Sequence, residues 1–230
     1  MQSDRKIVEI NRSLLDANQK LAEENRRHIE TLGAVAVNMI SGPGAGKTTL
    51  LEATADNLHG SLKIGVIEGD IETERDADRI RARGIPAIQI TTGGACHLDA
   101  GLVHKGIHGM EHQVGPDGLD LLFIENVGNL VCPATFYLGE HKRVVMVSVP
   151  EGSDKPAKYP RAFIGSDLFI ISKTDLLPHF DFSIEEAVSE ARRLNPEIKI
   201  IPLSATTGEG VDQWIHFLKD LAETRDEGKT

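Results

Sequence analysis

Three residues with metal-binding side chains occur in two loops of the chain. Cys96 and His97 are adjacent in a glycine-rich segment, and Cys132 is the only other cysteine. Thiolate and imidazole groups are good ligands for Zn²⁺ and Ni²⁺. Cys96 would lie near the amino-terminus of a helix expected over residues 98–112, a position that lowers the pKa of a thiol. Two cysteines can also be small buried hydrophobic residues, but the adjacent Cys-His pair favours a metal site.

A second kind of chemistry is indicated by residues 41–49, which read Ser-Gly-Pro-Gly-Ala-Gly-Lys-Thr-Thr. The segment follows a predicted strand and opens a predicted helix, which is the setting of a phosphate-binding P-loop. Its backbone N–H groups and the helix amino-terminus would face the phosphates. The general pattern has Gly where Ser41 stands, so we expect Gly42 to carry the turn instead. The predicted nucleotide-binding residues of this loop are Gly42, Gly44, Ala45, Gly46, Lys47, Thr48 and Thr49.

Lys47 and Thr48 have distinct expected roles in this loop. Lys47 would bridge the β- and γ-phosphates, and the hydroxyl of Thr48 would bind Mg²⁺. Glu125 ends the apolar run 119–124, where P-loop proteins place a carboxylate that holds Mg²⁺. A Mg²⁺-nucleotide complex is therefore expected between these three side chains.

The segment that follows Glu125 connects the two kinds of site. Gly128 stands where P-loop proteins sense the γ-phosphate through a backbone N–H, and Cys132 comes four residues later. If Cys132 meets Cys96 and His97 in space, nucleotide hydrolysis would move a metal site. This arrangement indicates metal delivery.

Asn129 directly follows the switch glycine, at the position where Ras-type GTPases orient the attacking water with Gln. Its amide is one methylene shorter than that of Gln, so we expect slow intrinsic hydrolysis. The predicted catalytic residues are Lys47, Glu125 and Asn129.

Asp70 ends the strand expected over residues 64–69 and would lie at the carboxyl edge of the sheet, where open α/β folds bind ligands. Two interpretations of Asp70 stay open. It could be a ligand of Mg²⁺, directly or through a bound water, or it could cap the helix expected over residues 72–83.

The segment Ser172-Lys173-Thr174-Asp175 predicts the choice of base. A carboxylate at Asp175 can accept hydrogen bonds from N1–H and the exocyclic amine of guanine, a pair that adenine lacks, and Lys173 would lie along the base. G proteins usually have Asn at the position of Ser172, so we expect a weaker anchor between this loop and the P-loop. Ser204 and Ala205, at the end of the next strand, would bring backbone near guanine O6. Together these residues favour GTP and GDP over adenine nucleotides.

These segments require elements that bring them to one place. Seven short, β-rich apolar runs occur at 34–40, 62–67, 87–91, 119–124, 144–149, 168–172 and 198–203, and most are separated by helical stretches at 47–59, 72–83, 98–112, 183–194 and 209–223. This alternation predicts an α/β fold with a doubly wound, mostly parallel sheet. We expect a P-loop domain over residues 33–230. Residues 1–32 predict a helical extension, one long helix or two short ones, outside the main core.

Composition narrows the class of protein. The 230 residues carry a formal net charge of −10 without any run of Lys and Arg, which argues against nucleic acid as a partner. No apolar run approaches the about 20 residues that a membrane helix needs, and the first residues are polar. We therefore expect a cytoplasmic protein without membrane contact, in which the cysteines are thiols.

Five motifs, in order along the chain, resemble those of the hydrogenase nickel-incorporation GTPases. They are the P-loop at 41–49, Glu-Gly-Asp at 68–70, Thr-Gly-Gly-Ala-Cys-His-Leu-Asp at 92–99, Glu-Asn-Val-Gly-Asn-Leu-Val-Cys-Pro at 125–133 and Ser-Lys-Thr-Asp at 172–175. The resemblance implies a GTPase that dimerises and supplies nickel during maturation of [NiFe]-hydrogenases. It implies a small zinc- and nickel-binding accessory protein as partner and, indirectly, the precursor of the hydrogenase large subunit.

The resemblance also implies that Cys96, His97 and Cys132 are the nucleotide-linked metal ligands, for nickel or zinc, at the dimer interface. Three ligands from one chain leave a site incomplete, and a two-fold axis would supply a second set. Some members have an amino-terminal cysteine-rich motif or a His-rich tract. This sequence has neither, so tight amino-terminal nickel storage is not expected.

Several alternatives stay open. The urease accessory GTPases are similar, but they place the key cysteine in a Cys-Pro-His arrangement. A nucleotide-dependent kinase would require an acceptor substrate, and a zinc-sensing module would use nucleotide only as a structural element. His104, His108 and His112 share one face of the helix expected over 98–112, either as a metal route or as a polar face.

Overall fold

The centre of the computed structural model, which describes residues 2–70 and 74–227, is a seven-stranded sheet. The strand order is β3-β2-β4-β1-β5-β6-β7, and all six neighbouring pairs are parallel. The strands are β1 (Val35–Ser41), β2 (Ile64–Asp70), β3 (Ala87–Thr91), β4 (Leu121–Glu125), β5 (Lys142–Ser148), β6 (Leu168–Ser172) and β7 (Lys199–Leu203). The predicted parallel α/β fold is confirmed, because the apolar runs are strands covered on both faces.

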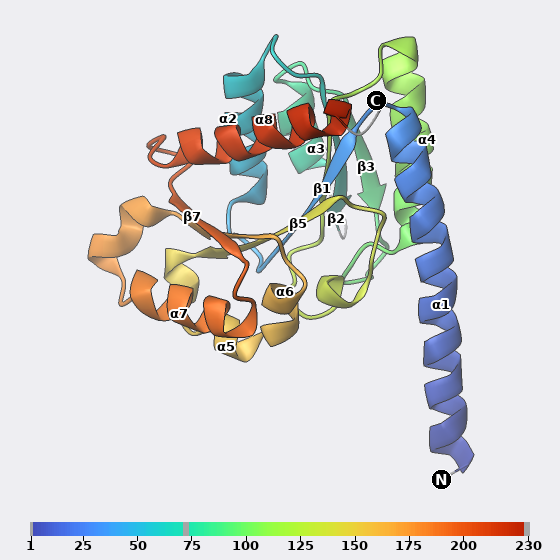
Figure 1. Cartoon of the computed structure of the whole chain (residues 1–230), viewed down its shortest axis with the longest axis horizontal. Coiled ribbons are helices and arrows are strands. Elements are labelled where there is room, and N and C mark those ends of the chain that lie inside the picture. The colour runs from blue at the N-terminus through green and yellow to red at the C-terminus, as the bar shows by residue number, and fades with distance from the viewer. Residues whose placement is uncertain (1, 71–73, 228–230) are drawn as a thin grey trace.

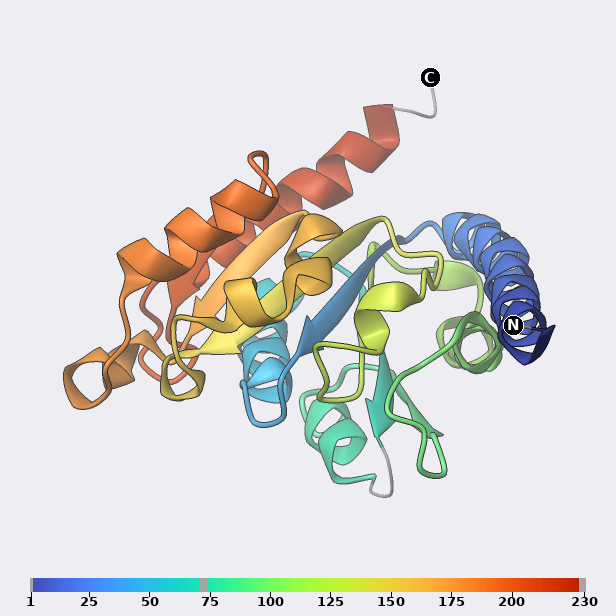
Figure 2. The same ribbon diagram turned by 90° about the horizontal axis from the view of Figure 1, so that it is seen from below.

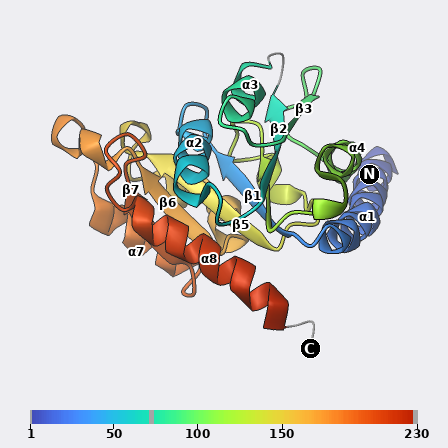
Figure 3. The ribbon, with the colours of Figure 1, turned by 90° about the horizontal axis from the view of Figure 1, so that it is seen from above.

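Helices cover both faces of the sheet (Figure 1). Successive side chains of a strand point to opposite faces, so Val37 and Met39 of β1 join one core cluster while Ala36 and Ile40 join the others. The first face is covered by α2 (Lys47–Leu58), α3 (Arg75–Arg81) and α8 (Val211–Glu227), and the second by α4 (Ala100–Val114), α6 (Pro160–Ile164) and α7 (Ile184–Leu194). The sheet is therefore doubly wound, and Figure 3 shows the helices around the strands from above.

The last helix is fixed by an aromatic anchor. Trp214 of α8 is fully buried, and its indole N–H donates to the hydroxyl of Thr54 on α2 at 2.8 Å. Its ring stacks on Phe217 with 5.8 Å between centroids. Burial of this large side chain with its polar atom paired holds α8 against the helix that follows the P-loop.

The amino-terminal segment forms one long helix, α1 (Gln2–Thr31), which lies beside α4 (Figure 2) and extends past the sheet domain (Figure 1). Ile29 is fully buried and belongs to the same core cluster as Val103 and Ile107 of α4. The carboxyl half of α1 is therefore part of the core, and the expectation that this segment lies outside it is wrong. Leu14, nearer the amino-terminus of α1, is exposed. The division of the chain into residues 1–32 and 33–230 stays a prediction.

Predicted and observed boundaries differ mostly at loop ends. The helix expected over 72–83 is described only from Arg75 to Arg81, and residues 71–73 lie outside the described residues. Among the described residues, no helix combines the length and apolar character that crossing a membrane requires.

Candidate nucleotide and metal site

The carboxyl ends of the parallel strands bring the predicted motifs to one edge of the sheet. The P-loop follows β1, Asp70 ends β2, Glu125 ends β4 and Ser172 ends β6. A cavity of about 370 Å³ opens there. Its lining includes the P-loop residues Gly44, Gly46, Lys47, Thr48 and Thr49 together with Asp70, Glu125, Gly128 and Lys173. The edge of the sheet is where α/β folds bind ligands.

The P-loop owes its shape to two glycines. Gly44 and Gly46 have φ values of 74° and 95°, a left-handed conformation that side chains with a Cβ rarely adopt. Gly42 is not left-handed, and the prediction that it carries the turn is wrong. A Cβ at Gly42 would instead collide with the carboxylate of Glu151, so Gly42 permits a close approach between two loops.

Ser41 holds the P-loop lysine. The ammonium group of Lys47 donates to the hydroxyl of Ser41 at 3.0 Å, and both residues are buried. The serine at the position of the expected glycine therefore orients Lys47 toward the cavity.

Two carboxylates face the expected position of Mg²⁺. The hydroxyl of Thr48 donates to Oε1 of Glu125 at 2.9 Å. Glu68 of β2 is paired in register with Glu125 of β4, and Oε2 of each carboxylate has no hydrogen-bond partner among the described residues. Orphaned buried oxygens of this kind, beside a P-loop hydroxyl, fit an oxygen-seeking divalent cation such as Mg²⁺.

The environment of these carboxylates disfavours their charge. Burial, together with the nearby Glu125 carboxylate, raises the pKa of Glu68 to about 8. Burial also raises the pKa of Glu125, although the charge of Lys47 opposes that rise. Glu68 was not among the site residues predicted from the sequence. The available signal was its position directly after the apolar run 64–67, near the carboxyl end of a strand. A bound cation would stabilise both groups in their charged form.

The loop after β6 is tied to the P-loop by two hydrogen bonds. The hydroxyl of Ser172 donates to the carbonyl of Ala45 at 2.7 Å, and the ammonium of Lys173 donates to the carbonyl of Gly44 at 2.7 Å. Lys173 adopts a left-handed backbone, with φ of 61°. The hydroxyl of Ser172 thus anchors this loop to the P-loop directly, and the expectation that this anchor is weaker than one made by Asn stays a prediction.

A smaller cavity of about 60 Å³ adjoins this loop. Its lining residues include Lys173, Ser204 and Ala205, three of the four residues predicted to lie around the base, together with Ala45 of the P-loop. Asp175 is exposed in the short helix Thr174–His179 and does not line this cavity.

The three predicted soft-metal ligands lie together. The thiol of Cys96 is 3.0 Å from the sulfur of Cys132, and its sulfur is 3.8 Å from Nδ1 of His97. One ligand atom from each residue lies within 4.8 Å of the others. The ring of His97 stacks on Phe136 with 4.2 Å between centroids, which fixes its orientation. This geometry can hold a borderline metal ion with two sulfurs and one imidazole.

The protonation of this cluster suits exchange of protons for a metal. The thiol of Cys96 raises the pKa of Cys132 through a hydrogen bond, and burial lowers the pKa of His97. A neutral imidazole is the form that binds a metal, while the thiols must lose their protons to do so.

The helix α4 does not begin at these ligands. Its first residue is Ala100, and Asp99 is the N-cap, with its carboxylate accepting from the N–H of Leu102 at 2.8 Å. Asp99 therefore caps the amino-terminus of α4, and Cys96 lies three residues before this cap.

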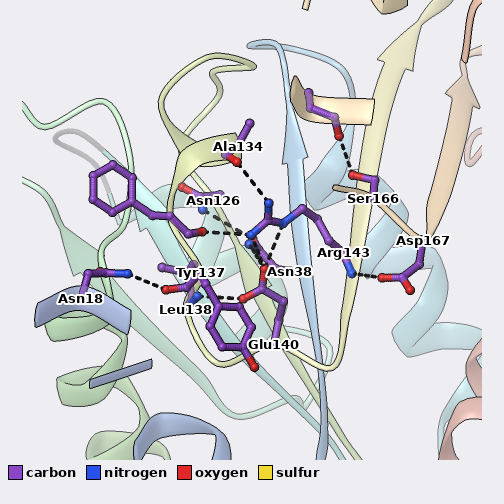
Figure 4. A network of polar contacts seen from close by, with 12 residues as sticks. Asn18, Asn38, Asn126, Ala134, Tyr137, Leu138, Glu140, Arg143, Ser166 and Asp167 are labelled. Atoms are coloured by element: carbon purple, nitrogen blue, oxygen red, sulfur yellow. Dashed lines mark hydrogen bonds and ion pairs between the residues drawn. The ribbon is translucent and has the colours of Figure 1, made fainter. Parts of the chain in front are cut away.

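Asn126 connects the nucleotide edge with the cysteine loop. Its side-chain oxygen accepts from the N–H of Leu98 at 3.1 Å, and its amide donates to Asn38 of β1 at 3.4 Å. Figure 4 shows this contact within a larger network in which Asn38 also donates to Glu140, the ion-pair partner of Arg143. A direct hydrogen bond thus joins the residue after the end of β4 to the residue that follows His97.

Gly128 and Asn129 lie at the P-loop side of this segment. A Cβ on Gly128 would be 2.8 Å from Cα of Pro43, so glycine alone allows the contact with the P-loop. The side-chain oxygen of Asn129 accepts from the N–H of Val131 at 2.7 Å and so faces the Cys132 turn. Asn129 lines a neighbouring cavity with Pro43 and Glu151, beside the phosphate cavity.

The stripe of histidines on α4 divides. His104 and His108 contact each other, whereas His112 is exposed at the end of the helix. The first two residues belong to a group with α1 that is distinct from the cysteine cluster.

The fold and these motifs match a described family and its solved members. Residues 36–202 match the family described as CobW/HypB/UreG, nucleotide-binding domain. The hydrogenase maturation factor HypB of Azotobacter chroococcum mcd 1 is 49% identical over 217 residues, which are 94% of this chain and 70% of that protein. The factor of the same name from Escherichia coli (strain K12) is 48% identical over 94% of this chain and 73% of its own length.

Two solved structures agree with this match. HypB from Helicobacter pylori in complex with nickel superposes with a TM-score of 0.86 at 39% identity, over 90% of this chain and 96% of that one. HypB from Archaeoglobus fulgidus gives a TM-score of 0.83 at 42% identity, over 90% of this chain and 100% of that one. With its P-loop and cysteine cluster on this fold, the chain belongs to the CobW/HypB/UreG family of nucleotide-binding proteins.

Proposed function

We propose that the chain is a GTP-hydrolysing metallochaperone that binds nickel and assists its insertion during [NiFe]-hydrogenase maturation. The observation that carries this proposal is that one segment, 125–132, contributes both to the phosphate cavity and to the Cys96–His97–Cys132 cluster. The relatives named hydrogenase maturation factor, and the nickel complex of the Helicobacter pylori protein, support the same assignment.

The phosphate groups would be bound by the P-loop. Backbone N–H groups from Gly44 to Lys47 and the amino-terminus of α2 supply positive potential without conformational change. Lys47, held by Ser41, would contact the β- and γ-phosphates. Mg²⁺ would supply charge neutralisation between those phosphates. Thr48 and Glu125 would hold it, with Asp70 at the edge of the same cavity.

Base selection would rest on the β6 and β7 ends. Asp175 would accept two hydrogen bonds from guanine, and the stem of Lys173 would lie along the ring. The small cavity beside Ser204 and Ala205 supports a base at this position. Since Asp175 is exposed in the described structure, nucleotide binding would order it against the base.

Hydrolysis would be slow. The side chain of Asn129 is engaged with the backbone of Val131, so its use in orienting water would require a change in that turn. We therefore assign Asn129 a switch role as well as a catalytic one.

The transported ion would be held by Cys96, His97 and Cys132. Two sulfurs and one nitrogen leave at least one coordination position open, because Zn²⁺ and Ni²⁺ take four or more ligands in such sites. A second copy of the chain would complete the site on a two-fold axis, so we propose a homodimer. Nickel is the cargo we propose, and Zn²⁺ is a competing ion with the same ligand preference.

Delivery requires partners beyond the dimer. We propose a small zinc- and nickel-binding accessory protein as the exchange partner, and the precursor of the hydrogenase large subunit as the eventual recipient. We also propose a cytoplasmic location and a division of the chain into an amino-terminal extension, residues 1–32, and a GTPase domain, residues 33–230.

The test is a metal titration in defined nucleotide states. Ni²⁺ and Zn²⁺ are titrated into the protein loaded with GDP and with a non-hydrolysable GTP analogue, while mass and metal content are measured. We expect a dimer whose affinity for metal depends on the nucleotide, and loss of that dependence in Cys132→Ala. Equal affinities in both states would refute the coupling, and metal transfer that survives Lys47→Ala would assign nucleotide a structural role only.

A further inference from the structure

A second group of metal-binding side chains joins α1 to α4 and shares no residue with the lining of the phosphate cavity. Nε2 of His28, on α1, is 3.2 Å from Oε2 of Glu111 on α4. Nδ1 of His108 is 3.5 Å from the same carboxylate oxygen. One ligand atom from each of these three residues lies within 4.8 Å of the others. Two imidazoles and a carboxylate from two helices therefore converge on one point.

The directions of the hydrogen bonds around this group follow from a buried asparagine. Asn25 of α1 is fully buried, and its amide donates to the carbonyls of Ala100 at 2.8 Å and Leu138 at 3.1 Å. Both amide hydrogens are thus used, and the side-chain oxygen of Asn25 must accept. The oxygen lies 2.9 Å from Nδ1 of His104, which therefore carries the proton.

The proton on Nδ1 determines the arrangement of the next histidine. With Nδ1 protonated, the neutral ring of His104 has a lone pair at Nε2, which lies 3.2 Å from Nε2 of His108. His108 must donate from Nε2 to satisfy this contact. Its lone pair is then at Nδ1, beside the carboxylate of Glu111.

With His108 neutral, its Nδ1 lone pair and the carboxylate of Glu111 are both acceptors 3.5 Å apart, and Nε2 of His28 lies beside the same carboxylate oxygen. A cation between them, either a proton on Nδ1 or a metal ion, satisfies both acceptors, and the experiment below distinguishes the two. An imidazole whose second nitrogen donates to a fixed acceptor is the usual form of a metal-binding histidine, because the outer hydrogen bond fixes tautomer and ring orientation.

We propose that His28, His108 and Glu111 form a second divalent-metal site, with His104 and Asn25 as positioning residues that fix the ring of His108. Two nitrogens, one carboxylate and no thiolate suit Zn²⁺ or Ni²⁺. This inference goes beyond the proposed function, because the site shares no residue with the cysteine cluster or the phosphate cavity.

The exposure of the ligands defines the kind of site. The side chain of His28 is 17% exposed, while those of Glu111 and His108 are 47% and 51% exposed. Three protein ligands leave further positions to water, so bound metal would exchange readily. Since His28 comes from α1 and the other two from α4, a bound ion would hold the long helix against the domain.

The experiment uses the full chain carrying Cys96→Ser and Cys132→Ser, which removes the thiol cluster. Zn²⁺, Ni²⁺ and Co²⁺ are titrated separately, with metal content measured by mass and the Co²⁺ complex followed by its absorption spectrum. We expect one ion per chain and a Co²⁺ spectrum without a thiolate charge-transfer band. The preferred metal of the site is the ion, Zn²⁺ or Ni²⁺, that binds with the higher affinity.

Three further variants in that background assign the residues. His108→Ala should abolish the remaining binding, and His104→Leu should weaken it by about 10–100-fold because it removes an outer hydrogen bond. His112→Ala, on the same helix and exposed, is the matched control and should bind as the parent does. Unchanged thermal unfolding of metal-free His108→Ala would show that this exposed substitution leaves the fold intact.

A readout of the helix itself separates a site from non-specific binding. Zn²⁺ should slow hydrogen exchange of the backbone amides around His28 on α1 in the parent background but not in His108→Ala. The proposal is overturned if the cysteine-free protein binds no metal, or if His112→Ala weakens binding as much as His108→Ala. Either result leaves the cysteine cluster untouched, because that cluster is absent from the protein tested.

Discussion

At the scale of single residues, the phosphate cavity depends on side chains held in unfavourable states until a ligand arrives. Glu68 and Glu125 are buried side by side, each with an oxygen that lacks a partner among the described residues. An unpartnered buried polar group costs about 1–3 kcal/mol. These two oxygens therefore lower the stability of the free protein, and a bound cation would satisfy both of them.

Glu68→Gln should therefore change stability and binding in opposite directions. Because the pKa of Glu68 is raised to about 8, a neutral amide removes charge repulsion with Glu125 only where Glu68 is ionised. We therefore expect a higher unfolding temperature of the nucleotide-free protein at about pH 9, and a weaker affinity for Mg²⁺-GDP by roughly tenfold. Thermal unfolding and calorimetric titration measure the two quantities. Glu197→Gln, exposed before β7, is the control. A loss of stability together with unchanged Mg²⁺-GDP affinity would contradict this account.

Asp175→Asn tests the recognition of guanine. Two hydrogen bonds to a charged carboxylate contribute about 1.5–3 kcal/mol each, so GTP affinity should fall by at least ~100-fold. Xanthosine triphosphate carries an acceptor where guanine has an amine, and an amide at position 175 should bind it more tightly than the parent does. Competition with a fluorescent nucleotide measures both affinities. An equal loss for both nucleotides would remove Asp175 from the base site.

At the scale of elements, the hydrogen bond from Leu98 to Asn126 is a direct contact between the nucleotide edge and the cysteine loop. The N–H of Val127 donates to the same side-chain oxygen at 3.0 Å, so Asn126 contacts both the strand end and the loop. Both contacts are buried, and we expect a displacement of one segment to displace the other.

Asn126→Ala should uncouple the two sites. The ratio of nickel affinities in the GDP and GTP-analogue states should approach one, and stability should fall by about 1–3 kcal/mol because the N–H of Leu98 loses its acceptor. Metal titration in each nucleotide state and urea unfolding are the measurements. Asn57→Ala, an exposed change on α2, serves as the control. A preserved ratio would show that coupling takes another route.

Most of the sheet was predictable from sequence, because buried parallel strands are continuous apolar runs. The P-loop motif also marks the carboxyl end of β1. The cluster of Cys96, His97 and Cys132 was also anticipated from residue types. Contacts that depend on three-dimensional proximity were not: Ser172 reaches the P-loop, and Glu68 enters the site from β2 through pairing with β4. The partner of a single polar side chain is set by the packing of distant segments, and no periodic pattern in the sequence predicts it.

At the scale of the whole molecule, His141, with only 15% of its side chain exposed, makes stability depend on pH. His141 lies between β1 and α1, with Nδ1 accepting from the N–H of Ala36 at 2.9 Å. Burial, aided by the charge of Arg26, lowers the pKa of His141 to about 4. The unfolded chain, with a pKa near 6.5, therefore binds more protons between these values.

The free energy of unfolding should consequently fall as the pH drops from about 6.5 to 4. Above about pH 6.5 the contribution of His141 to stability should be constant. His141→Asn, whose side-chain oxygen can accept from Ala36 but does not titrate, should lose less stability over that window. Urea unfolding at pH 7 and pH 5 measures the difference. His216→Asn, with 80% of its side chain exposed in the parent, is the control. Parallel losses in the parent and His141→Asn would exclude this residue as the source.

The two cysteines of the metal cluster also confer a sensitivity to oxidants. Their sulfurs are 3.0 Å apart, and both side chains are partly accessible to solvent. A disulfide requires sulfurs about 2.05 Å apart, so a displacement of roughly 1 Å would suffice. Peroxide, on taking two electrons and two protons from the pair, would convert the ligands into a covalent bridge between the loops at 96 and 132. Protein handled in air would then retain nucleotide binding while losing its metal cargo, and a thiol reductant would restore it.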